Sequence, residues 1–254
     1  MTEPVRMLVY FAHPDDESFG FAGSLSMLAD MGAQLTYVCA TRGEVGEILV
    51  DGLTTPDQLG PYREGELRAA LKIIGVQDLR LLGYRDSGMA GTPPNEHPAA
   101  FVNQDPELVA TRVADIILET KPQIMLLYGP DGIYGHPDHV FAHVTGMPAI
   151  AQAAARGYQI PNVYFSAASR ERVQKMASMP GNPFSKMSQE TLSTFGTPSA
   201  EITTWIDIRS VRDRKLAALM AHRTQVGNDG PFANLAPELR DMWFSVESAR
   251  TVPT

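Results

Sequence analysis

Short apolar runs alternate with amphipathic segments along the first half of the chain. Runs of mainly apolar residues, which predict buried strands, span residues 5–12, 34–40, 78–82 and 123–128. Between them, apolar residues recur with the period of a helix in residues 18–31, 62–74 and 106–119. The last of these helices is predicted to direct five apolar side chains inward: Leu108, Val109, Val113, Ile116 and Ile117.

The alternation of strand and helix predicts βαβ units, whose parallel strands lie in one sheet with right-handed crossovers. We therefore expect a Rossmann-like α/β fold, a three-layer sandwich with a mainly parallel sheet. The later pattern predicts a helix from His136 through His143, strands at 162–166 and 201–208, helices at 169–179 and 209–225, and a loop over 180–200. A chain of 254 residues suits a single domain, 1–254, with its core at about 5–170 and a less clearly patterned part at about 171–254.

Composition and net charge indicate which classes of binding partner the protein is expected to have. The chain has 44% hydrophobic and 20% charged residues, an ordinary globular balance, and a net charge of −8. An acidic chain without a basic patch argues against nucleic acid or an anionic membrane as partner. The first apolar run is too short for a signal peptide or a membrane span, so we expect a soluble cytoplasmic protein. The single cysteine, Cys39, lies in an apolar run and is expected to be buried.

Charge is concentrated where the first predicted strand gives way to a helix, in His13-Pro14-Asp15-Asp16-Glu17. Buried ionised groups need compensation, and a bound cation is one remedy. An imidazole and carboxylates suit zinc and similar divalent metals, and a catalytic zinc site uses three protein ligands and a water. The motif supplies His13 and one Asp, so a third ligand should lie elsewhere. Helix capping would account for Asp16 or Glu17 but not for the whole cluster.

A second cluster follows the fourth predicted strand, in His136-Pro137-Asp138-His139. Pro137 suits the first position of a helix, which places His136 near the N-cap and His139 in the first turn. His143 lies four residues after His139 and shares its face. Four of the six histidines thus lie in two segments, each at a strand's carboxyl end.

The loops that leave the other strands at the same edge supply further candidates for a ligand pocket. Arg42, Glu44 and Glu47 follow the second strand, and the long connection 83–103 follows the third. The first strand-to-helix turn lacks the glycine-rich loop of a dinucleotide-binding fold, which argues against a NAD-type dehydrogenase.

With both motifs in hand, the chain resembles the LmbE-like/PIG-L family of zinc-dependent de-N-acetylases, and most closely its mycothiol-pathway deacetylase and amidase. The likeness runs from about residue 5 to residue 145, and further on only the segment 221–225 is similar to the family. The resemblance implies that His13, Asp16 and His139 bind the metal. It implies that Asp15 is the general base and that His136 stabilises the oxyanion or protonates the leaving amine. Candidate substrate-binding residues are Arg63, Asp86, Tyr134, Met89 and Glu47.

These implied roles agree with the chemistry of the residues. Zinc lowers the pKa of a bound water to about 7 and polarises an amide carbonyl, and iron(II) is the alternative metal. Asp15, beside the ligand Asp16, can accept the proton of the water. His136 is expected to act in its protonated form, and Asp138 is expected to orient a ligand histidine or to raise the pKa of His136.

The sequence therefore predicts a zinc-dependent hydrolase that removes an acetyl group from the amine of an N-acetylglucosaminyl-type small molecule. Two alternatives stay open at this point: an amidase that cleaves mycothiol-type S-conjugates, and a non-catalytic metal-dependent sugar-binding module. The expected partner is a small-molecule amino-sugar substrate, and a homo-oligomer is compatible with the sequence. Glu17, His143 and His222 receive no role.

Overall fold

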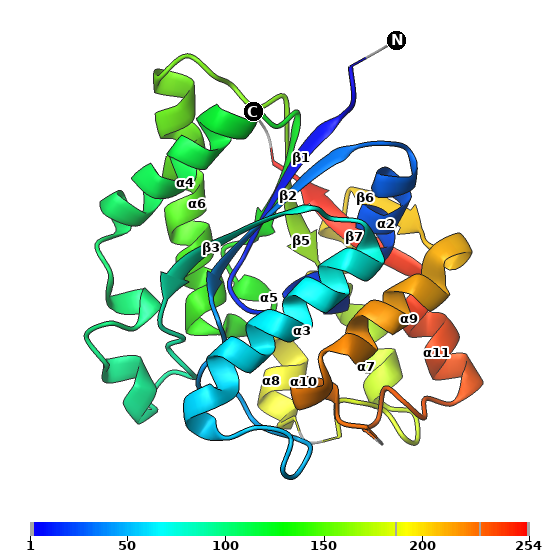
Figure 1. Ribbon diagram of the computed structural model, residues 1–254. Helices are drawn as coiled ribbons and strands as arrows, with labels where there is room; N and C mark the ends of the chain where they lie inside the picture. Colours follow the sequence, from blue (N-terminus) through cyan, green and yellow to red (C-terminus); the bar gives the residue numbers. More distant parts are fainter. Residues whose placement is uncertain (1–2, 186, 229, 253–254) are drawn as a thin grey trace.

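A seven-stranded sheet in the order β3-β2-β1-β4-β5-β7-β6 runs through the structure, a computed structural model that describes residues 3–185, 187–228 and 230–252 (Figure 1). The first five strands in this order are mutually parallel, and β7 pairs antiparallel with both β5 and β6. The expected mainly parallel α/β sheet is thus confirmed. The strand bounds are β1 Arg6–Phe11, β2 Gln34–Thr41, β3 Asp78–Tyr84, β4 Ile124–Tyr128, β5 Asn162–Ala167, β6 Thr204–Asp207 and β7 Val246–Thr251.

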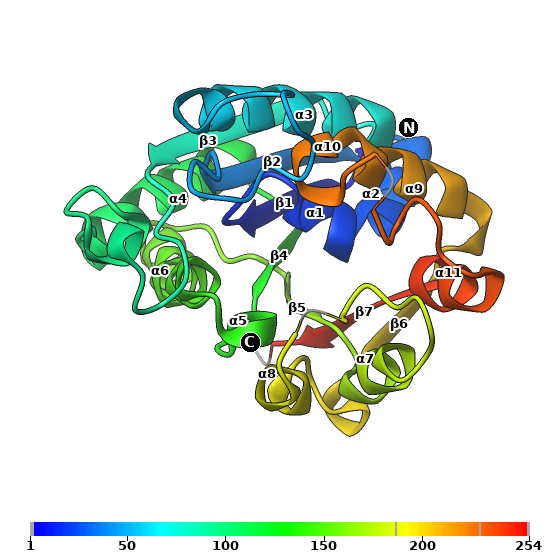
Figure 2. The ribbon, with the colours of Figure 1, turned by 90° about the horizontal axis from the view of Figure 1, so that it is seen from below.

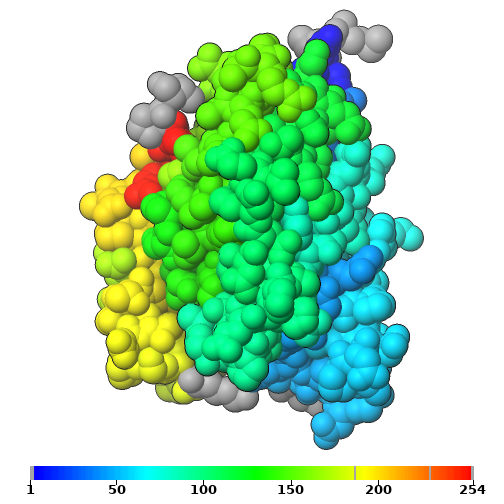
Figure 3. All heavy atoms as spheres, turned by 90° about the vertical axis from the view of Figure 1, so that its left-hand side faces the viewer, coloured from blue at the N-terminus to red at the C-terminus, as the bar shows by residue number. Residues whose placement is uncertain are grey.

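Helices pack on both faces of the sheet. Helices α2, α3 and α9 lie together on one face, and α4 and α6 cover the other, where Figure 3 shows them in green. Shorter helices surround the carboxyl ends of the parallel strands, the end that faces the viewer in Figure 2. The bounds are α1 Asp16–Gly20, α2 Ala22–Asp30, α3 Leu59–Ile74, α4 Pro106–Thr120, α5 Gly132–Gly135, α6 Pro137–Ala155, α7 Arg170–Ala177, α8 Gln189–Thr194, α9 Arg212–Ala221, α10 Arg223–Val226 and α11 Pro237–Phe244. None of the helices among the described residues combines the length and apolar character that crossing a membrane requires.

The parallel strands are apolar because helices cover both of their faces. Leu8, Val9 and Tyr10 in β1 and Leu126 and Leu127 in β4 are almost completely buried. The strands predicted from the apolar runs, with the helices predicted between them in the first half of the chain, are present with shifted ends.

Several expectations were wrong. The helix predicted at 18–31 begins at Asp16 and is divided at Phe21, and the one predicted at 209–225 is divided at His222. The segment 180–200, predicted as a loop, contains α8, while α11 and β7 were not predicted. Leu108 is 65% exposed rather than inward, because it lies in the first turn of α4 beyond the face that meets the sheet.

A buried ion pair attaches the C-terminal strand to the first helical layer. Lys215 on α9 donates to Glu247 on β7 at 2.7 Å, and the two side chains are 2% and 1% exposed. Glu247 also accepts from the backbone N–H groups of Gly23 and Ser24, which are orphan donors in the first turn of α2. Its carboxylate therefore joins three elements from opposite ends of the chain.

We predict that Glu247→Ala lowers the free energy of unfolding by about 3–5 kcal/mol, because it leaves the buried Lys215 charge and two helix N–H groups without their partner. Chemical denaturation measures the change. Glu201→Ala, which breaks an exposed pair with Arg250, is the control and should cost about 1 kcal/mol or less. Equal losses in the two variants would contradict the anchoring role of Glu247.

Candidate metal centre and active site

The two histidine-containing motifs meet because β1 and β4 are neighbours in the sheet. The strands are parallel and in register from Met7 opposite Ile124 to Tyr10 opposite Leu127, so both end at the same edge. His13 lies two residues after the end of β1, and His139 lies in the first turn of α6, after β4 and α5. Both imidazoles are buried.

His13, Asp16 and His139 converge on one point. His13 Nδ1 lies 3.2 Å from His139 Nε2, Asp16 Oδ1 lies 3.3 Å from His139 Nε2, and Asp16 Oδ2 lies 3.6 Å from His13 Nδ1. Ligand atoms bonded tetrahedrally to zinc at about 2.0–2.1 Å stand roughly 3.3–3.4 Å apart. Two imidazole nitrogens and a carboxylate are a donor set that suits a divalent cation such as zinc, and the distance between the two nitrogens is close to this spacing.

Hydrogen bonds to the other ring nitrogens leave the converging nitrogens free. His13 Nε2 lies 3.0 Å from Asp138 Oδ2, and His139 Nδ1 lies 3.2 Å from the carbonyl oxygen of Gly132. Each acceptor holds a proton on the nitrogen it contacts, so the opposite nitrogen presents its lone pair. Asp138 thus contacts one of the two histidines, as the first of the two roles expected for it requires.

Negative charge accumulates around this point. Asp86 Oδ1 lies 3.6 Å from His13 Nε2, and Asp138 Oδ1 is buried without a hydrogen-bond partner among the described residues. Although burial works in the opposite direction, Asp86 and Asp138 raise the pKa of His13 well above its ordinary value. The surroundings therefore favour a positive charge. The ligand atoms of His13, His136 and His139, and those of His13, Asp86 and Asp138, also lie within 4.8 Å of one another.

Asp15 has a different environment from Asp16. Its side chain is 14% exposed, and its Oδ2 accepts a hydrogen bond from the buried Arg63 at 3.1 Å. Burial raises the pKa of Asp15 to about 6, with Arg63 opposing and Asp16 adding to the shift. Arg63 also donates to the carbonyl oxygens of Pro14 and Gly43, so it joins the backbone of the motif to the loop that follows β2. A carboxyl with this pKa is suited to accept a proton near neutral pH.

His136 caps helix α6 with its own side chain, since its Nδ1 accepts from the backbone N–H of Asp138 at 3.1 Å. Burial, with the neighbouring His13 and His139, lowers the pKa of His136 to about 3. These surroundings disfavour the protonated form of His136 that the sequence analysis expected. The imidazole is neutral, and the cap places its proton on Nε2, where it can still donate a hydrogen bond.

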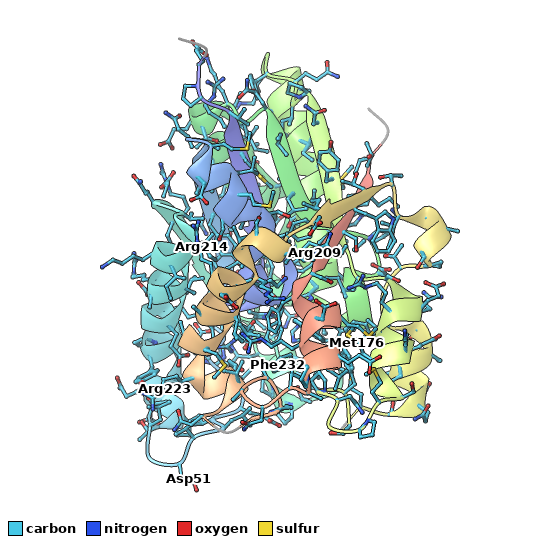
Figure 4. All side chains as sticks on the ribbon, turned by 90° about the vertical axis from the view of Figure 1, so that its right-hand side faces the viewer. Asp51, Met176, Arg209, Arg214, Arg223 and Phe232 are labelled. Atoms are coloured by element: carbon cyan, nitrogen blue, oxygen red, sulfur yellow. The ribbon has the colours of Figure 1, made fainter. Side chains whose placement is uncertain are left out.

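A cavity of about 370 Å³ opens beside this centre. Asp15, Asp16, Tyr134 and His139 are among its lining residues, and most of the others are apolar. Figure 4 labels two residues of that apolar part, Met176 on α7 and Phe232 on the segment that precedes α11. The other aromatic residues of the lining are Phe11, Phe19, Phe21, Tyr128, Phe184, Phe195 and Trp243. Half of the lining residues thus come from the less clearly patterned C-terminal part of the chain.

The structure separates the predicted substrate-binding residues into two groups. Arg63, Asp86 and Tyr134 lie at the centre: Asp86 beside His13, Arg63 on Asp15, and Tyr134 with its ring 5.1 Å from that of His139. Glu47 is exposed and Met89 is 48% exposed, and neither is among the described residues that line the cavity. His143 bonds to the carbonyl oxygen of Tyr128 at 3.0 Å.

The sequence reasoning did not find the roles of Glu17 and His222. Both are fully buried, and they contact each other at 2.6 Å beside Asp15. The segment 221–225 was a usable signal, because it was the one part of the C-terminal region that is similar to the family.

The sheet is mainly parallel, and at one edge of it two histidines and a carboxylate lie close together beside a further carboxylate. This combination of fold and site is that of an α/β metal-dependent hydrolase. The chain belongs to the GlcNAc-PI de-N-acetylase (PIG-L) family, whose model matches residues 8–150. The resemblance seen in the sequence is thereby confirmed.

Individual proteins extend the likeness past the matched region. The chain is 40% identical, over 95% of its length and 86% of the relative, to a 1D-myo-inositol 2-acetamido-2-deoxy-alpha-D-glucopyranoside deacetylase of Acidothermus cellulolyticus. Among solved structures, N,N'-diacetylchitobiose deacetylase from Pyrococcus horikoshii superposes with a TM-score of 0.67 at 20% identity, covering 98% of this chain and 84% of that one. The 4-carboxy-2-hydroxymuconate hydratase GalB of Pseudomonas putida has a TM-score of 0.62, also at 20% identity, with 98% and 97% covered. Because a deacetylase and a hydratase share this fold, the fold alone does not determine the reaction, and the reaction has to be argued from the site.

Proposed function

We propose that this protein hydrolyses the amide of an N-acetylglucosaminyl-type small molecule, releasing the free amine and acetate. The observation that carries the proposal is the convergence of His13, Asp16 and His139 beside Asp15, a carboxylate that contacts Arg63 rather than the two histidines. The printed activity of the Acidothermus relative, deacetylation of a glucosaminyl-inositol, supports the substrate class. A binding module without turnover would not require a separate proton acceptor at this place.

The metal is held by His13 Nδ1, His139 Nε2 and one Asp16 oxygen in this proposal. Zinc fits two imidazoles and a carboxylate, and iron(II) is the second choice. When bound, the cation supplies Lewis acidity to the amide carbonyl and to the attacking water.

The chain's own groups move the protons. Asp15 accepts the proton that water loses as its oxygen bonds to the carbonyl carbon, and Arg63 holds the carboxylate in place. The neutral His136 donates its Nε2 proton as a hydrogen bond to the oxygen on which charge develops. As the carbon–nitrogen bond breaks, the protonated Asp15 returns its proton to the amine. Arg63, Asp86 and Tyr134 are proposed to hold the sugar, with Glu47 and Met89 as outer contacts.

A specific observation favours the amidase as a second candidate. The cavity extends from Asp15 and His139 into an apolar region lined by residues such as Met176 and Phe184, and an acetyl group alone would leave that region empty. An enzyme that removes a bulkier acyl group would use it.

We predict that replacing the proposed proton acceptor and replacing a proposed metal ligand have different effects on metal content and activity. Asp15→Ala should retain one metal ion per chain but lose about two to four decades of turnover, because only the proton acceptor is gone. His13→Ala should lose the metal and the activity together. Elemental analysis and a free-amine assay with N-acetylglucosaminides measure both quantities, and a metal-free but active His13→Ala protein would refute the proposal.

Asp138→Asn should weaken metal binding about 10- to 100-fold, because the charge that fixes and polarises His13 is removed. Competition with a chelator gives the affinity. Asp105→Asn is the matched control, since Asp105 caps the exposed start of α4 and Asn caps equally well. Unchanged affinity in Asp138→Asn would show that His13 does not depend on this contact.

A series of N-acyl glucosaminides, from acetyl to hexanoyl, distinguishes the two candidate functions. A deacetylase should prefer the acetyl compound, whereas an amidase that uses the apolar cavity should prefer the longer chains. Ala168→Phe, which places a ring in the cavity wall, should then reduce turnover of the hexanoyl compound and spare the acetyl one. If Ala168→Phe affects both compounds alike, the cavity does not hold the acyl chain.

A further inference from the structure

Asp15 adopts a backbone conformation that an L-residue rarely takes. Its φ is 116° and its ψ is −23°, in a region where Cβ is crowded and glycine is the usual residue. Such a conformation persists only where the surroundings enforce it, and it is concentrated at functional sites. Asp15 is therefore held in place by contacts outside its own peptide units.

Glu17 supplies the contact to the Asp15 backbone. Its Oε2 accepts the hydrogen bond of the Asp15 backbone N–H at 3.1 Å. The Glu17 side chain is fully buried between α1 and β2, where the hydroxyl of Tyr37 approaches the same oxygen at 3.5 Å. A helix cap does not require this burial, because a carboxylate in a first turn is ordinarily solvated.

His222 fixes Glu17 from the C-terminal part of the chain. Its Nε2 lies 2.6 Å from Glu17 Oε1, which also accepts from the Ser18 hydroxyl at 2.6 Å. His222 stands at the break between α9 and α10, and Figure 2 shows α10 against α1 at this end of the sheet. Two residues on, Thr224 is bonded to Glu66 of α3 through both its N–H and its hydroxyl, which anchors the segment independently.

We propose that Glu17 and His222 are positioning residues, which hold the Asp15 backbone in its unfavourable conformation so that the Asp15 carboxylate faces the cavity beside Asp16. The inference rests on the proposed function, because it assigns Asp15 the proton transfer. A buried polar cluster with a purely structural role would also stabilise the fold. It would not need to include a hydrogen bond to the backbone N–H of Asp15, the one residue of this motif with a positive φ.

The kinetic test compares two replacements of His222. His222→Leu removes the donor to Glu17, and kcat should fall about 10- to 100-fold, the cost of a misplaced catalytic group, with KM and metal content unchanged. His222→Gln retains a donor and should recover most of kcat. Thr224→Val is the matched control: it loses a buried bond to a carboxylate in the same segment, and should lower the melting temperature without changing kcat.

A double-mutant cycle then tests whether His222 acts through Asp15. In an Asp15→Ala background, His222→Leu should cause no further loss of kcat, because the group it positions is already absent. Equal losses with and without Asp15, or a kcat that follows the melting temperature across all variants, would overturn the inference. An inactive wild-type enzyme would instead refute the proposed function, so the two failures are distinguishable.

Discussion

The pairing of β1 with β4 is the constraint on which the site depends. It brings the carboxyl ends of two strands together and collects His13, Asp16 and His139 from segments more than a hundred residues apart. Burying so many ionisable groups is unfavourable unless each finds a partner. The partners are distributed accordingly: Asp138 and the Gly132 carbonyl occupy the outer nitrogens of the two histidines, and the inner nitrogens face a space that a cation fits.

The C-terminal third is attached to this centre by buried carboxylates. Glu17 is hydrogen-bonded to His222, and Glu66 accepts a hydrogen bond from Thr224. Glu247 on β7 accepts hydrogen bonds from Lys215 and from the first turn of α2. The contacts of Glu17, of Glu66, and of Glu247 with α2 join residues far apart in the chain. They fix the region that supplies half of the cavity lining to the layer that carries the proposed catalytic groups. The contact of Glu17 with His222 therefore links the cavity wall to the backbone of Asp15, which in our proposal owes its place to the same contact.

The sequence could predict the strands of the first half and the two histidine motifs, because apolar runs and local charge clusters are visible along the chain. The lowered pKa of His136 could not be predicted, since it depends on the burial of this side chain and on its approach to His13 and His139. The strand β7 was missed because its buried positions include Glu247 and Ser248, whose burial is explained only by distant partners. The break at His222 has the same origin: a helical pattern continues, but the contact with Glu17 is made at the break itself.

The adjacent aspartates show why a strained residue is useful here. In a regular helix or strand, neighbouring side chains point in different directions, so two consecutive carboxylates could not both line one cavity beside a cation. The positive φ of Asp15 turns its carboxylate to the same cavity as that of Asp16 while leaving it on Arg63. Asp16, beside His13, His139 and the Tyr128 hydroxyl, has its pKa lowered despite burial, whereas that of Asp15 rises. Two consecutive residues thus place a carboxylate of lowered pKa beside one of raised pKa, and the proposed division into metal ligand and proton acceptor uses this difference.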